Sequence, residues 1–392
     1  MENIYADNGS TSFPKAPGVG EAIRKYIEES ALNISRGGYG PAYEVMDRVF
    51  EVRRKIKDLV GISEGNGDID EHNVIFVPSV TYALNFIILG LLKHGDHVII
   101  SSMEHNAVAR PVESLKKRGV EVSCVPCRED GTLDMDAFRN AFRKETGLVV
   151  MALVSNVSGT IQDAETIGQI CSEKGVPFVL DAAQGAGAVE MDFIKWKLSG
   201  LCIPGHKGLL GPQGIGAMIV TSDFAREIDP VIFGGTGSVS DSLEMPDFLP
   251  DRFEAGTLNL PGIIGLGASL DYIRERTPSE ILKHERELAG RFIDGIKDID
   301  EIRITGPEDI SRRTGVVSVD FKTMDNSQVA YILEDSYGIM TRCGLHCAPL
   351  AHRTLGTYPE GTVRFSFGAF NTIEEADYIA QCVKKIVSAD KN

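Results

Sequence analysis

The chain of 392 residues lacks the features that mark several protein classes. It has no apolar run near the roughly 18 residues that a membrane-spanning helix needs. Its first residues carry neither a basic start nor an apolar core, so we expect no secretory signal. Lysine and arginine total 40 against 56 acidic residues, and the resulting net charge of −16 disfavours nucleic acid and anionic membrane surfaces as partners.

Cysteine is also sparse. The seven cysteines are an odd number scattered over the chain, which favours free thiols in a reducing cytoplasm over a disulfide framework. The sequence contains no internal repeat, low-complexity tract or long linker. A hydrophobic content of 43% is ample for a buried core, and the length predicts two or three domains.

Short apolar runs alternate with amphipathic segments between residues 70 and 220. Strands are predicted at residues 74–77, 97–101, 120–126, 148–154, 177–180 and 215–220. Helices are predicted between them at residues 81–93, 109–118, 135–144 and 167–174. This alternation indicates an α/β fold with a mainly parallel sheet covered by helices on both faces.

The pattern changes after Pro261. Helices at 262–274, 279–298 and 327–337 accompany strands at 302–305, 315–320 and 362–367, which predicts a small α+β domain. We therefore expect a large α/β domain over residues 20–260. The small domain would comprise residues 261–392 together with residues 1–19, which we expect to fold back onto it.

Two charged residues follow strand-like runs. Lys207 lies in the turn Gly205-His206-Lys207-Gly208, where a lysine in a partly dry site can form a Schiff base, although a solvated surface lysine fits the same turn. Asp181 ends an apolar run and either caps the next helix or pairs with a protonated ring nitrogen, as pyridoxal phosphate requires. One helix and one strand are expected between them, so both side chains can reach one crevice.

Three further positions follow strands at the same predicted edge. Ser79-Val80-Thr81 begins a helix and suits a phosphate, although such triplets also begin ordinary helices. His105 can stack on a flat ring, carry protons or serve a structural role. Asn156 can donate to a ring oxygen or form an Asx turn.

Several motifs occur together and in order. They are Ser-Asn-Val-Ser-Gly-Thr at 155–160, Asp-Ala-Ala-Gln at 181–184, Gly-His-Lys at 205–207, Glu-Ala-Gly-Thr-Leu-Asn at 254–259 and Arg-Phe-Ser at 364–366. In this order and spacing the chain resembles class V aminotransferase-like enzymes, and within them the cysteine desulfurase and selenocysteine lyase branch. The resemblance covers essentially the whole chain. It implies the type I fold of pyridoxal-phosphate-dependent transferases, with a seven-stranded sheet in the large domain.

The resemblance also implies roles for individual residues toward pyridoxal 5'-phosphate. Lys207 would form the Schiff base, Asp181 would bind the ring nitrogen, His105 would stack on the ring, Asn156 and Gln184 would contact the cofactor or its ring hydroxyl, and Thr81 and His206 would hold the phosphate. Thr257 would reach the phosphate of the neighbouring subunit, which implies a homodimer. Arg364 would clamp the substrate carboxylate, with Arg342 and Asn33 as secondary contacts.

Two residues depart from the family pattern. Pro204 stands where many relatives have a serine whose hydroxyl helps to bind the phosphate, and proline also lacks a backbone donor. Tyr82 stands where relatives often have an acid. Both changes are expected to alter the polar contacts around the cofactor.

The segment Thr341-Arg-Cys-Gly-Leu-His-Cys-Ala-Pro349 resembles the active-site loop of the desulfurases, with Cys347 at the persulfide-forming position. A single cysteine can equally be a small buried residue. A polar loop with Arg342 and His346 nearby favours the thiolate. Cys343 is either a spare thiol or a partner for Cys347 under oxidation, and no metal site is expected.

The resemblance therefore implies a cysteine desulfurase that converts cysteine to alanine and holds the sulfur on Cys347, with Lys207 as the base and His105 as a proton donor. Sixteen residues lie between Cys347 and Arg364, which resembles the short-loop desulfurases that use a sulfur-accepting protein. The alternatives are a selenocysteine lyase, another class V activity (transaminase, epimerase or β-lyase) and a non-catalytic sulfur carrier or scaffold.

Overall fold

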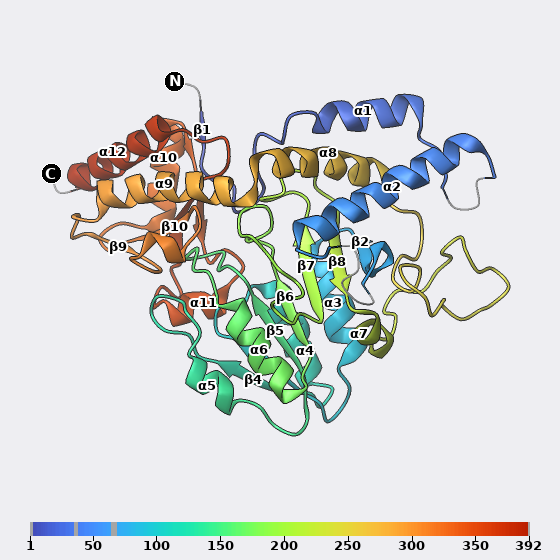
Figure 1. Cartoon of the computed structure of the whole chain (residues 1–392). Coiled ribbons are helices and arrows are strands. Elements are labelled where there is room, and N and C mark those ends of the chain that lie inside the picture. Colours follow the sequence, from blue (N-terminus) through green and yellow to red (C-terminus); the bar gives the residue numbers. More distant parts are fainter. Residues whose placement is uncertain (1–2, 35–37, 64–68, 391–392) are drawn as a thin grey trace.

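A seven-stranded sheet forms the centre of the computed structural model, which describes residues 3–34, 38–63 and 69–390 (Figure 1). The strand order is β2 (Val74–Val77), β8 (Gly216–Val220), β7 (Gly200–Pro204), β6 (Phe178–Asp181), β5 (Thr146–Ala152), β3 (His97–Ser101) and β4 (Glu121–Val125). Strand β8 is antiparallel to both neighbours, and the other pairs are parallel. The prediction of a mainly parallel α/β sheet is confirmed.

Alternation along the strands sends side chains into two cores. In β2, Ile75 and Val77 belong to one core, and Val74 and Phe76 belong to the other. The first core is covered by α3 (Val80–Leu91), α4 (Asn106–Lys116) and α7 (Ser222–Glu227). The second is covered by α2 (Gly40–Leu59), α5 (Met135–Asn140), α6 (Ala164–Lys174) and α8 (Leu260–Arg276), and α1 (Val19–Glu29) packs against α8.

The C-terminal part has its own antiparallel sheet in the order β12 (Arg342–Gly344), β13 (Thr362–Ser366), β10 (Val316–Phe321) and β9 (Ile302–Ile304). One face packs on α9 (Pro278–Ile296), α10 (Asn326–Tyr337) and α12 (Ile373–Asp390). The N-terminal strand β1 (Ile4–Tyr5) pairs with β11 (Ile339–Met340), so the start of the chain joins this part. Shorter elements are α11 (Pro349–Thr354) and the 3₁₀ helices Glu71–Asn73 and Ile310–Arg312.

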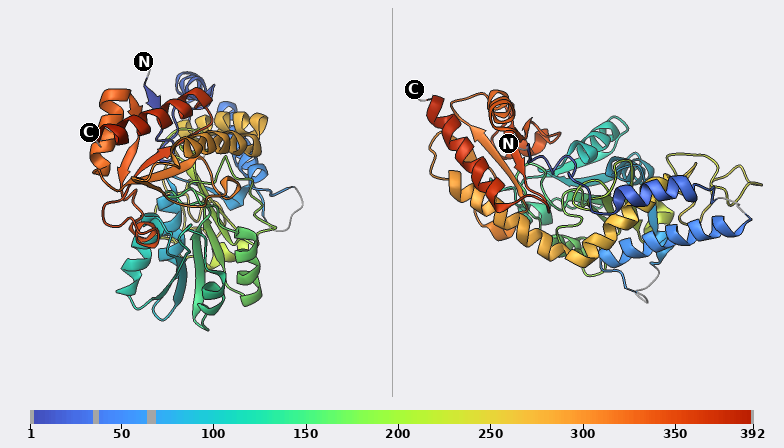
Figure 2. Two further views of the ribbon diagram at one scale, coloured as in Figure 1. Left: turned by 90° about the vertical axis from the view of Figure 1, so that its left-hand side faces the viewer. Right: turned by 90° about the horizontal axis from the view of Figure 1, so that it is seen from above.

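Helices α8 and α9 follow each other along the molecule (Figure 2). They are separated at Thr277, which has a left-handed φ of 60°, and Pro278 begins α9. The apolar residues of α8 lie in the core of the large sheet, and those of α9 lie in the C-terminal core. The boundary at residues 260 and 261 stays a prediction.

The segment between β6 and β7 consists of turns, where the sequence suggested a helix. Gly187 has a φ of 89°, and a Cβ there would lie 2.2 Å from the carbonyl oxygen of Gly208. This close approach requires glycine and holds the segment against the loop that carries Lys207. In the described parts of the chain, no helix has both the length and the apolar character needed to cross a membrane.

Candidate active site

A pocket lies at the carboxyl ends of β3, β5, β6 and β7, beside the beginning of α3. Its lining includes seven residues that the sequence analysis assigns to the cofactor: Thr81, His105, Asn156, Asp181, Gln184, His206 and Lys207. The carboxyl ends of parallel strands meet at one edge of a sheet, which is why residues so far apart in sequence converge here. Their individual roles stay predictions.

Asp181 and Lys207 are opposite charges in one poorly hydrated site. Asp181 ends β6, is buried, and accepts a hydrogen bond from the backbone N–H of Ala183 at 2.9 Å. Burial raises the pKa of Asp181, and the nearby Lys207 lowers it. Burial lowers the pKa of Lys207 to about 8, against the opposing effect of Asp181. A substantial fraction of the Lys207 amine is therefore neutral near pH 8.

His105 is the N-cap of α4. Its Nδ1 accepts a hydrogen bond from the backbone N–H of Ala107 at 3.0 Å, so the neutral ring carries its proton on Nε2. Burial lowers the pKa of His105 to about 4, and the cationic Lys207 and Arg342 act in the same direction. The imidazole is thus neutral near pH 7, with one N–H available to the pocket.

The beginning of α3 and His206 both line the pocket. Ser79 is the N-cap of this 12-residue helix, and its side chain makes no capping hydrogen bond within the described part of the chain. The buried Nδ1 of His206 likewise has no hydrogen-bond partner among the described residues. A helix N-terminus beside a free imidazole nitrogen suits a phosphate group. Pro204, at the end of β7, also lines the pocket.

Both amide side chains in the pocket are engaged by other segments. Asn156 Nδ2 donates to the carbonyl oxygen of His346 at 2.7 Å. Gln184 Nε2 donates to the carbonyl oxygen of Gly9 at 2.8 Å. The two residues therefore tie the pocket to the Cys347 loop and to the N-terminal segment, and their contacts with a cofactor stay predictions.

Arg364 and Arg342 lie opposite each other on β13 and β12. The Arg364 side chain is 1% exposed; its Nη2 donates to Asp7 Oδ1 at 2.7 Å and to Ser10 Oγ at 2.8 Å. Its Nη1 donates to the carbonyl oxygen of Asn156 at 3.1 Å. Arg342 Nη1 donates to Ser10 Oγ at 2.9 Å. The structure thus places both predicted carboxylate-binding arginines beside the N-terminal segment.

Cys347 lies on the loop between β12 and α11 and is exposed. Its Sγ is 3.8 Å from Arg342 Nη2, and its carbonyl oxygen accepts from the backbone N–H of Asn106 at 2.8 Å. Cys347 and His346 have left-handed φ values of 58° and 47°, which few non-glycine residues adopt. The loop is therefore held in one unusual conformation beside the helix that His105 caps.

The expectation that His346 favours the Cys347 thiolate is wrong. His346 is buried, and its Nε2 lies 3.1 Å from Thr362 Oγ1. Burial lowers the pKa of His346 well below its usual value, so the ring carries no charge near neutral pH. The positive charge beside the Cys347 sulfur comes from Arg342.

Cys343 is the neighbour of Arg342 on β12. It pairs with Val363 in the β12–β13 register and packs on the C-terminal core, whereas Arg342 contacts Ser10 and Cys347. Adjacent strand residues point to opposite faces, so Cys343 points away from the side on which Cys347 meets Arg342. All seven cysteines are free thiols.

Five nominated residues are not among those that line this pocket: Arg342, Arg364, Cys347, Thr257 and Asn33. Thr257 and Asn33 are exposed, and neither is among the residues that line the pocket. For Thr257 this agrees with a role in a neighbouring subunit, which stays a prediction. The contact of Asn33 with substrate also stays a prediction.

Sequence reasoning missed Glu104. This residue is buried beside His105, where it accepts from the Ser101 hydroxyl and, at 3.2 Å, from the backbone N–H of Ala152. Burial raises the pKa of Glu104 to about 8, so this carboxyl is largely protonated at neutral pH. An acid directly before the pocket histidine is the signal that could have identified it as a support for the β3–α4 turn.

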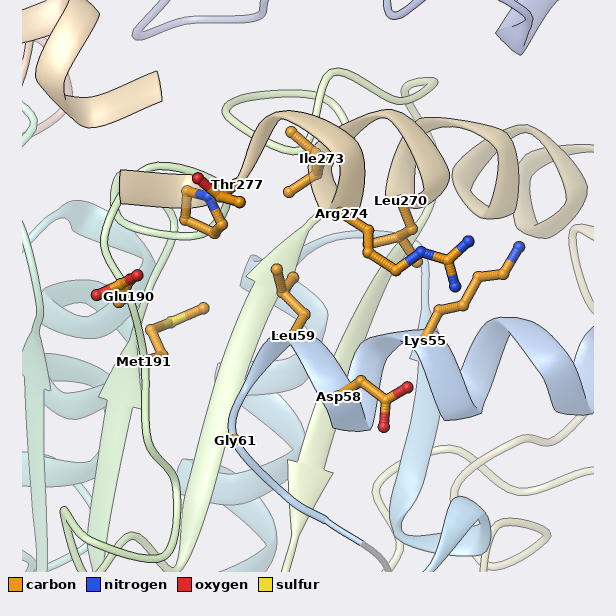
Figure 3. A pocket seen from close by; sticks show the side chains of 11 residues that line it. Lys55, Asp58, Leu59, Gly61, Glu190, Met191, Leu270, Ile273, Arg274 and Thr277 are labelled. Atoms are coloured by element: carbon orange, nitrogen blue, oxygen red, sulfur yellow. The ribbon is translucent and has the colours of Figure 1, made fainter. Parts of the chain in front are cut away.

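A second pocket lies between α2, α8 and residues 190 and 191 (Figure 3). Leu59, Met191, Leu270 and Ile273 give it an apolar lining, with Lys55 and Arg274 at its border. None of the predicted site residues lines it. Within the described ranges, no group of three or more His, Cys, Asp and Glu side chains is placed to hold a metal ion.

Comparison with known proteins agrees with this geometry. The model of the family "Aminotransferase class-V" matches residues 4–379. The chain therefore belongs to the class V aminotransferase family, and this membership implies pyridoxal phosphate as the cofactor. The type I fold that the motifs implied is confirmed as well.

Several similar proteins with known names are cysteine desulfurases. Probable cysteine desulfurases from Methanothermobacter thermautotrophicus and Pyrococcus abyssi are each 34% identical, with 98% and 99% of this chain and 95% of each relative covered. The apo structure of a cysteine desulfurase from Thermococcus onnurineus NA1 superposes with a TM-score of 0.91 at 31% identity, covering 99% of this chain and 95% of that one.

Proposed function

We propose that the protein is a pyridoxal-phosphate-dependent cysteine desulfurase, which converts L-cysteine to L-alanine and holds the released sulfur on Cys347. The observation that carries the proposal is the position of Cys347. Its exposed thiol lies beside the Arg342 guanidinium, on a loop that is hydrogen-bonded to the start of α4 and to Asn156. The full-length similarity to cysteine desulfurases supports the same reaction.

The pocket residues fit the cofactor. Lys207 would hold it covalently, Asp181 would pair with its ring nitrogen, and His206 with the α3 N-terminus would receive its phosphate. A cationic ring nitrogen would stabilise the buried Asp181 carboxylate, and the phosphate would give the unpartnered His206 Nδ1 an acceptor. When bound, the cofactor would stabilise the negative charge that develops on the substrate Cα by withdrawing electron density from it.

The protein orients the substrate through its carboxylate. Arg364 has a buried Nε with no hydrogen-bond partner among the described residues, and this N–H can take one carboxylate oxygen. The Arg342 guanidinium adds positive charge on the same side. With the carboxylate held there, Lys207 would remove the Cα proton, for which a neutral amine is required.

The sulfur transfer then uses the Cys347 thiolate. Its sulfur forms a bond to the substrate sulfur, and the bond between substrate sulfur and Cβ breaks. The electron pair of that bond stays with the carbon, which takes up a proton and becomes the methyl group of alanine, and the proton held by Lys207 returns to Cα. The sulfur remains on Cys347 as a persulfide. Arg342 Nη2 lies 3.8 Å from the Cys347 sulfur, and His105, next to the Asn106 that bonds the Cys347 backbone, would donate a proton from Nε2.

A persulfide on this loop needs an acceptor that comes to it. The Cys347 backbone is anchored at Asn106 and the preceding residue at Asn156, which restricts movement of the thiol. We therefore propose that a small thiol or a sulfur-accepting protein removes the sulfur and regenerates Cys347. The free state of the seven cysteines agrees with activity in the cytoplasm.

The proposal includes a homodimer. Large apolar side chains are exposed on the segment before Thr257, with Phe233 73%, Phe248 49% and Leu243 fully exposed, and Tyr82 beside the pocket is 48% exposed. Several large apolar side chains exposed on one segment agree with an interface there. Size-exclusion chromatography with light scattering should give a dimer, and Leu243→Glu should shift it toward monomer. A monomeric parental protein would contradict this part.

Incubation of the holoprotein with L-cysteine and a reducing thiol tests the reaction. Alanine and sulfide should form in equal amounts. Cys347→Ala should lose both products with cysteine, whereas Cys343→Ala, the matched control four positions away, should keep them. Activity of Cys347→Ala on selenocysteine but not on cysteine would agree with the proposed reaction, since selenium leaves more easily than sulfur. Full activity of Cys347→Ala on cysteine would refute the persulfide step.

A further inference from the structure

The N-terminal segment places a carboxylate on the arginine that the proposed function assigns to the substrate. Asp7 Oδ1 is 2.7 Å from Arg364 Nη2, and this is an ion pair between residues 357 positions apart in sequence. Ser10 Oγ donates to Asp7 Oδ1 at 2.8 Å and accepts from the same Nη2 at 2.8 Å. Both hydrogens of Nη2 are therefore taken by residues of the chain itself.

One donor of the Arg364 guanidinium, the Nε–H group, has no hydrogen-bond acceptor among the described residues. A carboxylate binds the side of a guanidinium through Nε and Nη2 together. Nε is buried without a partner among the described residues, while Nη2 is occupied by Asp7 and Ser10. A substrate carboxylate that uses both nitrogens must take over the position of the Asp7 carboxylate on Nη2.

The surrounding contacts allow that exchange. The Asp7 side chain is 20% exposed, whereas that of Arg364 is 1% exposed, so the carboxylate is the partner that can turn toward solvent. The Tyr5 hydroxyl bonds the carbonyl oxygens of Asp7 and Thr11, which holds the backbone of this turn. Gly9 lies directly over Arg364, and a Cβ there would be 3.1 Å from Cζ.

We propose that Asp7 is a specificity-determining residue, an internal carboxylate that occupies Arg364 in the free enzyme and is displaced by the carboxylate of the substrate. This inference rests on the proposed function, because it assumes an amino-acid substrate at Arg364. The internal carboxylate neutralises a buried guanidinium between turnovers. It also makes an anionic group on the ligand necessary, since an amine without a carboxylate cannot replace Asp7.

The test compares ligand binding in holoprotein variants by isothermal titration calorimetry. The probes are L-alanine, which carries the carboxylate, and ethylamine, which lacks it. Asp7→Asn should bind L-alanine about tenfold more tightly, the effect of removing one competing charge-assisted hydrogen bond. Asp7→Glu, which keeps the charge, should stay near the parental affinity, and Asp298→Asn, an exposed site remote from the pocket, controls for net charge. Ethylamine affinity should not change.

Thermal unfolding gives a second measurement. Loss of Asp7 leaves the buried Arg364 without its anion, so the free Asp7→Asn variant should melt at a lower temperature, and L-alanine should raise its melting point more than that of the parental protein. If Asp7→Asn does not fold, Asp7→Ala serves as the second charge-removing variant. Unchanged or weaker L-alanine binding in these variants overturns the inference. Absence of L-alanine binding to the parental protein overturns the inference and the substrate assignment together, whereas missing alanine formation from cysteine overturns only the reaction.

Discussion

Replacement of Arg53 by methionine tests how the segment with Thr257 is held. Arg53 Nη2 lies 2.7 Å from Glu254 Oε2, and the two side chains are 4% and 6% exposed. The backbone N–H of Phe76 donates to the other carboxylate oxygen at 2.6 Å, and the Arg53 guanidinium lies 4.5 Å from the centre of the Phe76 ring. The pair thus joins α2 and β2 to the residues just before Thr257.

The expected magnitude follows from the fate of Glu254. Arg53→Met leaves a buried carboxyl that must be neutral, and protonating a glutamate of ordinary pKa at pH 7 costs about 3.7 kcal/mol. Removal of one partner of a buried pair costs about 3–5 kcal/mol in general. We therefore expect Arg53→Met to lower the free energy of unfolding by about 3 kcal/mol at pH 7. Arg53→Met combined with Glu254→Gln should recover part of the loss, because glutamine keeps the acceptor for Phe76.

The sign of the pH dependence is a further check. Burial already raises the pKa of Glu254, with Arg53 opposing it, so removal of Arg53 raises the pKa further. A carboxyl with a raised folded-state pKa binds more protons in the folded than in the unfolded state, so stability falls as the pH rises above about 4.3. The deficit of Arg53→Met relative to the parental protein should therefore be smaller at pH 5 than at pH 7.5. Urea unfolding followed by circular dichroism at both values measures it; a deficit below about 1 kcal/mol, or one that grows at pH 5, would refute the reasoning.

Three further predictions concern single residues. Under mild oxidation, peptide mapping of the parental protein should show no disulfide between Cys343 and Cys347, and the oxidant should inactivate Cys343→Ala, which is fully active beforehand, as fast as it inactivates the parental protein; a mapped 343–347 bridge contradicts the assigned faces of β12. Pro204→Ser should lower the dissociation constant of pyridoxal phosphate by about fivefold through one added hydrogen bond, measured by absorbance titration of the apoprotein, and unchanged affinity argues against a phosphate at this end of the pocket. Burial lowers the pKa of His352 to about 4, so its uncharged form stabilises the fold above pH 6.5 and this contribution is lost as the pH falls toward 4. Between pH 6.5 and pH 5 the free energy of unfolding of His352→Gln should therefore fall less than that of the parental protein. Equal falls of the two proteins in urea unfolding would contradict this prediction.

The sequence predicts the pocket residues that follow strand ends well, because the geometry of a parallel sheet brings those ends together. Asp181 and Lys207 are examples, and they line one pocket. The sequence does not reveal the Asp7–Arg364 pair, since no local pattern joins positions so far apart. It also misleads for His346, because proximity in the chain does not show that the left-handed backbone turns this imidazole inward to Thr362.

The register of β12 against β13 connects these observations. In the observed register Arg342 lies opposite Arg364, and Cys343 lies opposite the buried Val363. A slip by one residue would exchange the two faces, moving Arg342 into the C-terminal core and Cys343 toward Cys347. Burying an unpaired arginine there is costly, whereas a thiol packs readily among apolar side chains. The same alternation therefore sets the two arginines side by side at Ser10, supplies the cation beside the Cys347 sulfur, and keeps Cys343 on the opposite face.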